Sequence, residues 1–236
     1  PATEELKKQL QAQDMWSQYL EVGIGPDAEI FTKTAPMASI GFGSELGILP
    51  ASSWNNPEPE IVLAVSSSGK IQGAALGNDV NLRDFEGRSA LLLGEAKDQN
   101  GSCAIGPWIR LFDDSFSLDS IKMAKVELTI VGPDGYEASG VNKMAEISRS
   151  PEDLVAQALG EHHQYPDGLM LFLGTMFAPT EDREKEGQGF THHLGDRVEI
   201  ATPGLGRLVN WVNHTNAIPR WDYGICDLMA FLQTNL

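Results

Sequence analysis

The chain has 236 residues, 42% of them hydrophobic, and its 33 acidic and 17 basic side chains give a formal net charge of −16. This length suffices for one well-buried domain with a small appendage, and the acidic balance argues against nucleic acid or an anionic membrane surface as a partner. Cys103 and Cys226 are too few for a disulfide framework, and neither a signal peptide nor an apolar run of roughly 18 residues is visible. These absences favour a reducing, cytoplasmic location.

The chain opens with a helical pattern. Residues 3–20 predict one amphipathic helix, because apolar side chains recur there at near-helical spacing, namely at Leu6, Leu10, Met15, Trp16 and Tyr19. Since the chain starts at Pro1 directly in this pattern, we interpret residues 1–20 as a helical arm or linker after a further N-terminal region, and residues 21–236 as the main domain. Residues 21–60 are rich in Gly, Pro and Ser and predict short strands and ordered loops.

Three segments predict β-hairpins. In each, two extended apolar stretches are joined by a turn of glycine, proline, serine or aspartate. The paired stretches are 61–65 with 71–76, 125–131 with 136–140, and 197–200 with 208–211. A sheet-rich fold follows from them.

A helix is predicted to begin at Pro151. Ser150 is a suitable N-cap, proline suits the first helical position, and Glu152 and Asp153 favour the positive end of the helix dipole. Residues 160–168 end this helix, 169–173 predict a buried strand, and 178–195 form a polar loop long enough to be functional or mobile. With two or three helices in all, the fold class is α+β and mostly β.

Three acidic residues form the pattern with the most chemical content. Glu58 and Glu60 share one face of an extended segment, because residues i and i+2 of a strand point the same way. The hairpin that follows returns the chain so that Asp79 lies beside them. Partly buried carboxylates repel one another unless a cation joins them, and oxygen-only ligands suit Mg²⁺, with Mn²⁺ or Ca²⁺ as substitutes. The alternative is three solvated surface acids.

The segments around these acids resemble the fumarylacetoacetate hydrolase superfamily. The similar segments are 57–60 (Pro-Glu-Pro-Glu), 77–84 (Gly-Asn-Asp-Val-Asn-Leu-Arg-Asp), Lys97 and 101–107 (Gly-Ser-Cys-Ala-Ile-Gly-Pro), collinear over most of residues 29–210. The resemblance implies a mixed β-roll with a few peripheral helices, with 21–236 as the catalytic domain. The short gap between the acids, Trp54 and the 103–107 segment resemble the 2-keto-3-deoxy-D-pentonate dehydratase branch, whose members carry an additional N-terminal region.

The resemblance also nominates catalytic residues. Lys97 follows Asp79 at the distance where the superfamily places a lysine, and beside a cation its pKa can fall enough for acid–base work. Arg83 matches an arginine that faces the active site in the hydrolases, although an Arg83–Asp84 pair bracing the turn is an equal alternative. His163, near the end of the 151 helix, is a reserve candidate, and stabilisation of that helix end is its simpler interpretation.

Three further residues are candidates for substrate binding. Lys33 lies where superfamily members place substrate-facing residues and can pair with a substrate carboxylate, although a surface cation is a comparable interpretation. Gly174 and Thr175 match a Gly-Thr segment of the family, whose hydroxyl and backbone N–H groups suit a carboxylate or a developing oxyanion. An ordinary strand-end threonine is the alternative.

The expected function is Mg²⁺-dependent dehydration of 2-keto-3-deoxy-D-pentonate to 2,5-dioxopentanoate, in non-phosphorylative pentose oxidation. The runner-up is an acylpyruvase-type hydrolase of a 2,4-diketo acid, followed by a decarboxylase and a catalytically silent relative. Fumarylacetoacetate hydrolase places a histidine base in the segment that here reads 34–38 (Thr-Ala-Pro-Met-Ala), and its fourth carboxylate ligand has only Asp27 and Glu29 as uncertain matches. Both departures favour a lyase. The expected partners are a small anionic 2-keto acid and further copies of this chain, as a homodimer or homotetramer.

Overall fold

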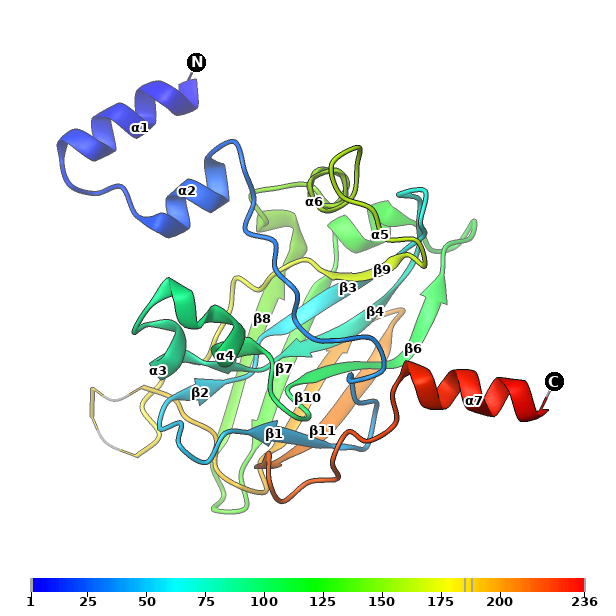
Figure 1. Ribbon diagram of the computed structural model, residues 1–236. Helices are drawn as coiled ribbons and strands as arrows, with labels where there is room; N and C mark the ends of the chain where they lie inside the picture. The colour runs from blue at the N-terminus through cyan, green and yellow to red at the C-terminus, as the bar shows by residue number, and fades with distance from the viewer. Residues whose placement is uncertain (1, 185, 188, 236) are drawn as a thin grey trace.

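Two β-sheets form the centre of the molecule in the computed structural model, which describes residues 2–184, 186–187 and 189–235 (Figure 1). One sheet has five strands in the order β1-β11-β10-β7-β8, another has four in the order β6-β4-β3-β9, and β2 pairs with β5. The strands are β1 (Glu45–Ile48), β2 (Asn55–Asn56), β3 (Pro59–Val65), β4 (Ile71–Asp79), β5 (Asn81–Leu82), β6 (Cys103–Leu111), β7 (Lys125–Val131), β8 (Glu137–Lys143), β9 (Leu169–Phe172), β10 (Arg197–Thr202) and β11 (Gly206–His214).

The hydrophobic core lies between the two larger sheets. Ile61 and Leu63 of β3 pack with Leu128 of β7 and Ile200 of β10, and all four are buried. Because side chains alternate along a strand, Glu60 of β3 points to the opposite face of the four-stranded sheet. That sheet therefore has one face in the core and one face available for a site.

The predicted hairpins are confirmed. β3–β4, β7–β8 and β10–β11 are antiparallel pairs whose registers match the predicted stretches. β1 pairs in parallel with β11 while the other pairs are antiparallel, so the sheets are mixed, as predicted. The predicted fold class, α+β and mostly β, is also confirmed.

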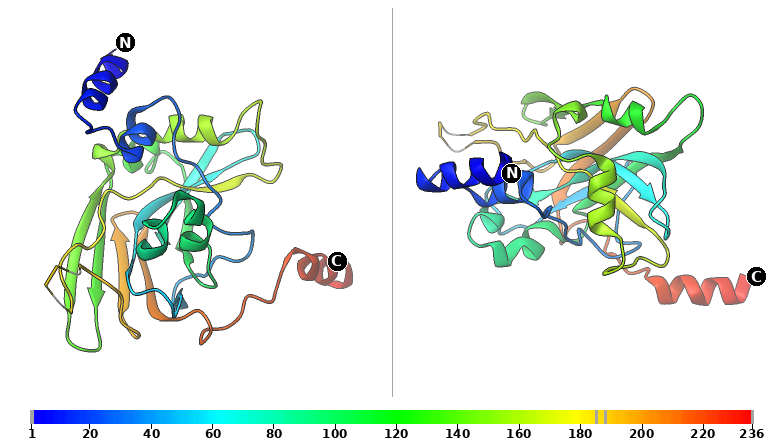
Figure 2. Two further views of the ribbon diagram at one scale, coloured as in Figure 1. Left: turned by 60° about the vertical axis from the view of Figure 1, so that its left-hand side comes forward. Right: turned by 90° about the horizontal axis from the view of Figure 1, so that it is seen from above.

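Helices surround the sheets and are more numerous than predicted (Figure 2). Three of them, α3, α4 and α5, are only four or five residues long and carry too little periodicity to be recognised in the sequence. In Figures 1 and 2, α1 and α7 project from the body of the molecule. The helices are α1 (Ala2–Ala12), α2 (Gln18–Ile24), α3 (Arg83–Glu86), α4 (Leu93–Lys97), α5 (Leu118–Lys122), α6 (Pro151–Ala158) and α7 (Ile225–Asn235).

The single helix predicted over residues 3–20 is wrong. Asp14 has a φ of 56°, which lies in the left-handed region and interrupts the helix. Ser17 then caps α2, since its side chain accepts a hydrogen bond from the N–H of Leu20 at 3.2 Å. Apolar residues keep a near-helical spacing through both helices, so the sequence pattern did not indicate the N-cap at Ser17 between them.

The α6 helix begins as predicted, with Ser150 as N-cap and Pro151 as its first residue. It ends at Ala158, and residues 160–163 form a tight bridge instead of a last helical turn. His163 is therefore not a helix-end residue. The predicted long loop is confirmed, because the described part of residues 178–195 contains no helix or strand.

Candidate active site

The β3–β4 hairpin brings the three predicted acids together. Pro59 pairs with Asn78 in the antiparallel register, so Asp79 at the end of β4 comes next to Glu58 just before β3. The backbone N–H of Asp79 donates to the carbonyl of Glu58 at 3.1 Å, which fixes this juxtaposition. Glu58, Glu60 and Asp79 each offer one oxygen, and these oxygens lie within 4.8 Å of one another.

The surroundings of these carboxylates favour a cation. Burial raises the pKa of Glu58 despite the opposing effect of Lys97. Burial, and then repulsion from Asp79 and Glu58, raise the pKa of Glu60 well above its ordinary value. A bound cation would relieve both costs. Because the donors are oxygens only, the cluster fits Mg²⁺ or a similar hard cation.

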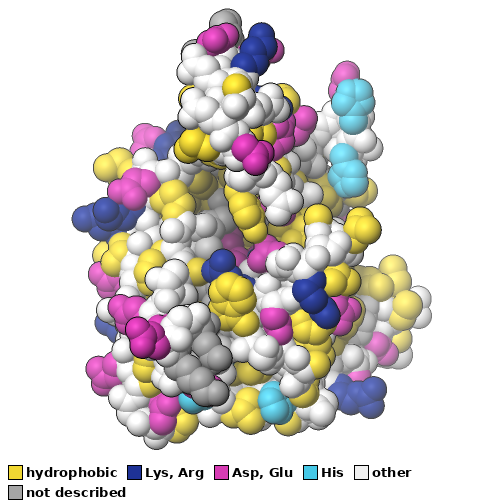
Figure 3. All heavy atoms as spheres, turned by 90° about the vertical axis from the view of Figure 1, so that its left-hand side faces the viewer, with side chains coloured by type: hydrophobic (Ala, Val, Ile, Leu, Met, Phe, Trp, Pro, Cys, Tyr) yellow, Lys and Arg dark blue, Asp and Glu magenta, His cyan; other side chains and the backbone are white. Residues whose placement is uncertain are grey.

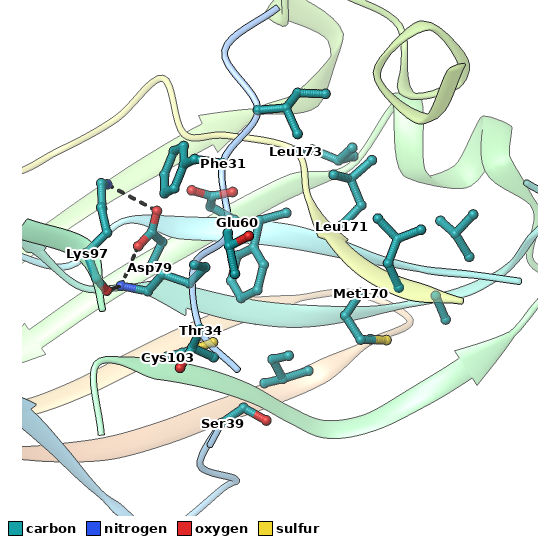
Figure 4. A pocket seen from close by; sticks show the side chains of 18 of the residues that line it. Phe31, Thr34, Ser39, Glu60, Asp79, Lys97, Cys103, Met170, Leu171 and Leu173 are labelled. Atoms are coloured by element: carbon teal, nitrogen blue, oxygen red, sulfur yellow. Dashed lines mark hydrogen bonds and ion pairs between the residues drawn. The ribbon is translucent and has the colours of Figure 1, made fainter. Parts of the chain in front are cut away.

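Two lysines supply the positive charge within this cluster. Lys97, the last residue of α4, places its Nζ 2.6 Å from Glu58 Oε2 and 3.1 Å from Asp79 Oδ2. Lys33 places its Nζ 2.7 Å from Asp79 Oδ1. All of these side chains are at most 15% exposed, so solvent screens the ion pairs only weakly. Figure 4 shows Lys97, Asp79 and Glu60 side by side.

The other carboxylate oxygens are held by neutral donors. Asn81 Nδ2 donates to Glu58 Oε1 at 3.0 Å, and the N–H of Gly174 donates to Glu60 Oε2 at 2.6 Å. Among the described residues, five of the six oxygens in the cluster thus have a partner within the chain, the exception being Glu60 Oε1. The cluster is well oriented before any ligand arrives.

Lys97 holds its proton in this arrangement. Burial by itself lowers the pKa of Lys97, but the nearby Glu58 and Asp79 carboxylates outweigh it and raise the pKa. The predicted fall of this pKa depends on a cation, because a cation on the same carboxylates removes the attraction that retains the proton. The centre of the Phe31 ring lies 5.9 Å from Lys97 Nζ, and both residues line the same cavity.

The acids lie at one end of a cavity of about 880 Å³. Figure 3 shows a hollow with acidic side chains visible inside it between hydrophobic ones. The far end of the cavity is mainly apolar, with Ala64, Val65, Leu169 and Met170 in its wall, and Figure 4 shows Met170 and Leu171 on that side. The volume is within the range of small-molecule sites.

Three further acids, Glu29, Glu86 and Asp167, line the cavity. Burial, followed by repulsion from Glu86, raises the pKa of Glu29. Asn81 Nδ2 donates to Glu86 Oε2 at 2.6 Å as well as to Glu58, so Asn81 joins these two acids. Glu86 and Asn81 were not predicted, and the only sequence signal for them is their place just after Asp79.

Gly174 and Thr175 both line the cavity, but their groups are already engaged. Gly174 has a φ of 86° and its N–H faces Glu60. Thr175 Oγ1 donates to the Phe177 carbonyl at 2.8 Å and accepts from the Phe177 N–H at 3.2 Å. In this structure, Gly174 orients an acid and Thr175 shapes the local turn.

Arg83 and His163 are not brought to the cavity wall. The Arg83 guanidinium stacks over the Trp54 ring at 4.9 Å. The exposed His163 ring lies 4.8 Å from Tyr165. The expected Arg83–Asp84 brace is also absent among the described contacts: Asp84 instead accepts from the Ser52 hydroxyl at 2.8 Å and the Ser53 N–H at 2.9 Å.

A mixed five-stranded sheet and a cluster of carboxylates at the end of a hairpin are the features of a metal-dependent enzyme. Comparison with known proteins identifies its family. Residues 5–213 match the family described as fumarylacetoacetate (FAA) hydrolase, C-terminal, and the chain belongs to this family. Among the described residues, no helix is long and apolar enough to cross a membrane.

Two curated relatives and a solved structure are similar to the chain. The chain is 31% identical over 193 residues to the 2-dehydro-3-deoxy-D-arabinonate dehydratase of Saccharolobus solfataricus, covering 80% of this chain and 60% of the relative. It is 30% identical over 194 residues to a probable 2-keto-3-deoxyxylonate dehydratase of Haloferax volcanii, covering 82% and 63%. It thus spans less than two thirds of either relative. A 2-keto-3-deoxy-D-arabinonate dehydratase complexed with magnesium and 2,5-dioxopentanoate has 28% identity and a TM-score of 0.74, covering 84% of this chain and 66% of that one.

Proposed function

We propose that this chain carries a Mg²⁺-dependent dehydratase of 2-keto-3-deoxy-D-pentonate, with 2,5-dioxopentanoate and water as products. The observation that carries the proposal is the buried cluster of Glu58, Glu60 and Asp79 with Lys97 inside a cavity. The relative crystallised with magnesium and 2,5-dioxopentanoate supports the choice of metal and product.

The proposed reaction needs one cation and two proton-transfer groups. When bound at Glu58, Glu60 and Asp79, a divalent cation supplies Lewis-acid polarisation of the keto-acid end of the substrate. Lys97 then takes the proton from C3, which becomes acidic beside the carbonyl. Glu29, which lines the cavity at its acid end, is assigned as the group that assists departure of the C4 hydroxyl as water.

The product of this elimination has a double bond between C3 and C4 and still carries the C5 hydroxyl. Transfer of a hydrogen from C5 to C3 through the dienol gives an enol with a double bond between C4 and C5. Movement of the proton from the C5 hydroxyl oxygen to C4 then gives the C5 aldehyde. The Phe31 ring, 5.9 Å from Lys97 Nζ, gives this part of the site an apolar neighbour.

The second candidate is hydrolysis of a C–C bond in a 2,4-diketo acid, since the same carboxylate cluster suits it. No histidine lines the described cavity wall, so a histidine-activated water has no support here. That observation favours the dehydratase.

Product analysis tests the proposal. The purified chain is incubated with Mg²⁺ and 2-keto-3-deoxy-D-xylonate or D-arabinonate, and products are followed by ¹³C NMR. We expect 2,5-dioxopentanoate, with no turnover after chelation. Pyruvate and a second acid from a 2,4-diketo acid would instead establish the hydrolase, and inactivity on both substrates would refute both assignments.

A further inference from the structure

Residues 28–39 form a segment without helix or strand that lines the acid end of the cavity, and we call it the strap. It carries Glu29 and Phe31 into the cavity. Figure 4 shows this part of the chain passing across the acid cluster, with Phe31 and Thr34 on it. The position of Glu29 and Phe31 therefore depends on what holds the strap in place.

Side chains, rather than backbone pairing, attach the strap to the body. In the described part of the chain, no backbone–backbone hydrogen bond joins residues 28–39 to another element. The Ala28 N–H donates to Gln157 Oε1 at 2.6 Å, and Thr34 Oγ1 donates to Asp98 Oδ1 at 2.8 Å. The third anchor is Lys33, and it is the only one of these three that carries charge into the acid cluster.

The ammonium of Lys33 makes its contacts inside the protein. It lies 2.7 Å from Asp79 Oδ1, donates to the Val80 carbonyl at 2.9 Å and donates to the Lys97 carbonyl. Two of its three donors are thus used on backbone carbonyls, and its charge is paired with Asp79. Its contacts fit an anchor better than the substrate-binding role expected from the sequence.

Asp79 is the point where the anchor and the cation site meet. Lys33 Nζ lies beside Asp79 Oδ1, which accepts no hydrogen bond among the described residues, and Lys97 donates to Oδ2, so a cation bound to Asp79 would share this carboxylate with two ammonium groups. Two positive charges on one carboxylate oppose each other strongly in a buried site. A cation at Asp79 must therefore weaken the Lys33 contact that holds the strap.

We propose that Lys33 is a positioning residue that couples the strap to the cation site: it holds the strap over the cavity and competes with the divalent cation for Asp79. This inference rests on the metal site of the proposed function. Coupling between two sites is reciprocal. A bound cation lowers the equilibrium constant for strap attachment by the same factor by which the attached strap lowers the affinity for the cation. Cation binding therefore favours release of the strap.

The first test uses the unmodified chain without substrate. Hydrogen exchange of the Ala28 amide, which is the strap amide that donates a hydrogen bond to the body among the described contacts, is measured with and without saturating Mn²⁺. We expect faster exchange of this amide when Mn²⁺ is bound. Unchanged or slower exchange in the presence of bound Mn²⁺ would overturn the coupling.

The second test measures Mn²⁺ affinity by calorimetry in Lys33→Met, with Thr34→Val as the matched control. Both variants remove a strap anchor, but only Lys33→Met removes a charge from Asp79. We expect Lys33→Met to bind Mn²⁺ on the order of tenfold more tightly and Thr34→Val to bind it as the unmodified chain does. Both variants should show faster exchange of the Ala28 amide.

The outcomes separate this inference from the proposed function. Equal or weaker Mn²⁺ binding by a folded Lys33→Met would overturn the competition, while the metal site itself would stand. If Lys33→Met does not fold, the exchange experiment on the unmodified chain decides. Failure of the unmodified chain to bind any divalent cation would overturn the metal site and this inference together, and turnover of another substrate would leave the inference intact.

Discussion

Glu60 differs from the other two acids because its second oxygen, Oε1, is the only one in the cluster without a partner among the described residues. Replacing Glu60 with Gln keeps the shape and removes the charge. We expect Glu60→Gln to lose cation affinity by more than ~10²-fold, since loss of outer-shell partners alone costs up to that factor. Calorimetry with Mn²⁺ measures the loss. The exposed Glu127→Gln serves as control, and near-normal affinity in Glu60→Gln would remove this residue from the metal site.

Lys97 is expected to act on the C3 proton. In Lys97→Met, turnover should fall by roughly 10²–10⁴-fold, and deuterium from solvent should no longer enter C3 of bound substrate. Exchange that persists while product formation falls would assign Lys97 to departure of the C4 hydroxyl instead. Because Lys97 pairs with Glu58 and Asp79, we expect cation binding to tighten in the variant, which calorimetry checks separately.

The buried His192, which does not line the cavity, contributes to the change of the free energy of unfolding with pH. The His192 side chain is fully buried, and burial lowers its pKa although Asp196, 3.2 Å away, opposes this. Burial also works against ionised Asp196, but hydrogen bonds from His192 and Arg183 hold its pKa below the ordinary value. The unfolded chain therefore binds more protons than the folded chain as pH falls below about 6.5 for histidine and about 4 for aspartate.

His192 should consequently lower the free energy of unfolding as pH decreases from 7 to 5, and Asp196 should lower it further below pH 4, whereas Glu60, whose pKa is raised, contributes in the opposite direction. Urea denaturation at several pH values measures this. In His192→Phe, the decrease between pH 7 and 5 should be smaller. Replacing the exposed His162 with Ala should leave the slope as it is, and an equal slope in all three proteins would refute the assignment.

At the scale of elements, β4 packs closely against side chains of β3 and β9 at Gly77. A Cβ on Gly77 would lie 2.4 Å from both Phe172 of β9 and Val62 of β3. Gly77→Ala should therefore lower the free energy of unfolding by about 1–3 kcal/mol. Gly94→Ala is the matched control, because no atom lies within 4 Å of its Cβ and alanine suits the helix α4. Equal stability of the two variants in urea denaturation would contradict this packing argument.

The elements that the sequence predicted are those whose signals are local. The β3–β4 hairpin and the α6 helix are determined by turn residues and a cap within a few positions. Strand alternation and the hairpin predicted the three acids, and the family resemblance nominated Lys97. The contact of Gly174 with Glu60 joins residues 114 positions apart through pairing of β3 with β9. Spacing along the chain contains no information about such pairing.

Wrong or missing predictions have equally specific causes. The break at Asp14 was hidden because apolar residues keep their period across it. The internal contacts of Lys33 could not be predicted, because they come from two distant segments, at Asp79–Val80 and Lys97. Glu86 belongs to no motif recognised in the sequence. It is linked to the site by the hydrogen bond that it accepts from Asn81 Nδ2.

For the whole molecule, the two ends differ in how they are attached. Arg149 donates to the carbonyls of Val22 at 2.9 Å and Gly25 at 2.8 Å, so the chain after α2 is held on the body. The α7 helix has no buried residue among those described, although its sequence is largely apolar. We propose that residues 1–20 form an arm. We also propose that the exposed apolar side chains of α7 form a surface for a partner.

The exposed α7 predicts self-association. An isolated helix of 11 residues is marginal in water, and Trp221, Ile225, Met229 and Phe231 are each about half exposed. We expect a homodimer or homotetramer, which sedimentation equilibrium at micromolar concentration would show as a multiple of 25.6 kDa. Replacing Met229 and Phe231 together with Glu should shift the mass towards one chain. The polar Gln233→Glu on the same helix controls for added charge, and an unmodified chain that sediments at 25.6 kDa would disprove the prediction.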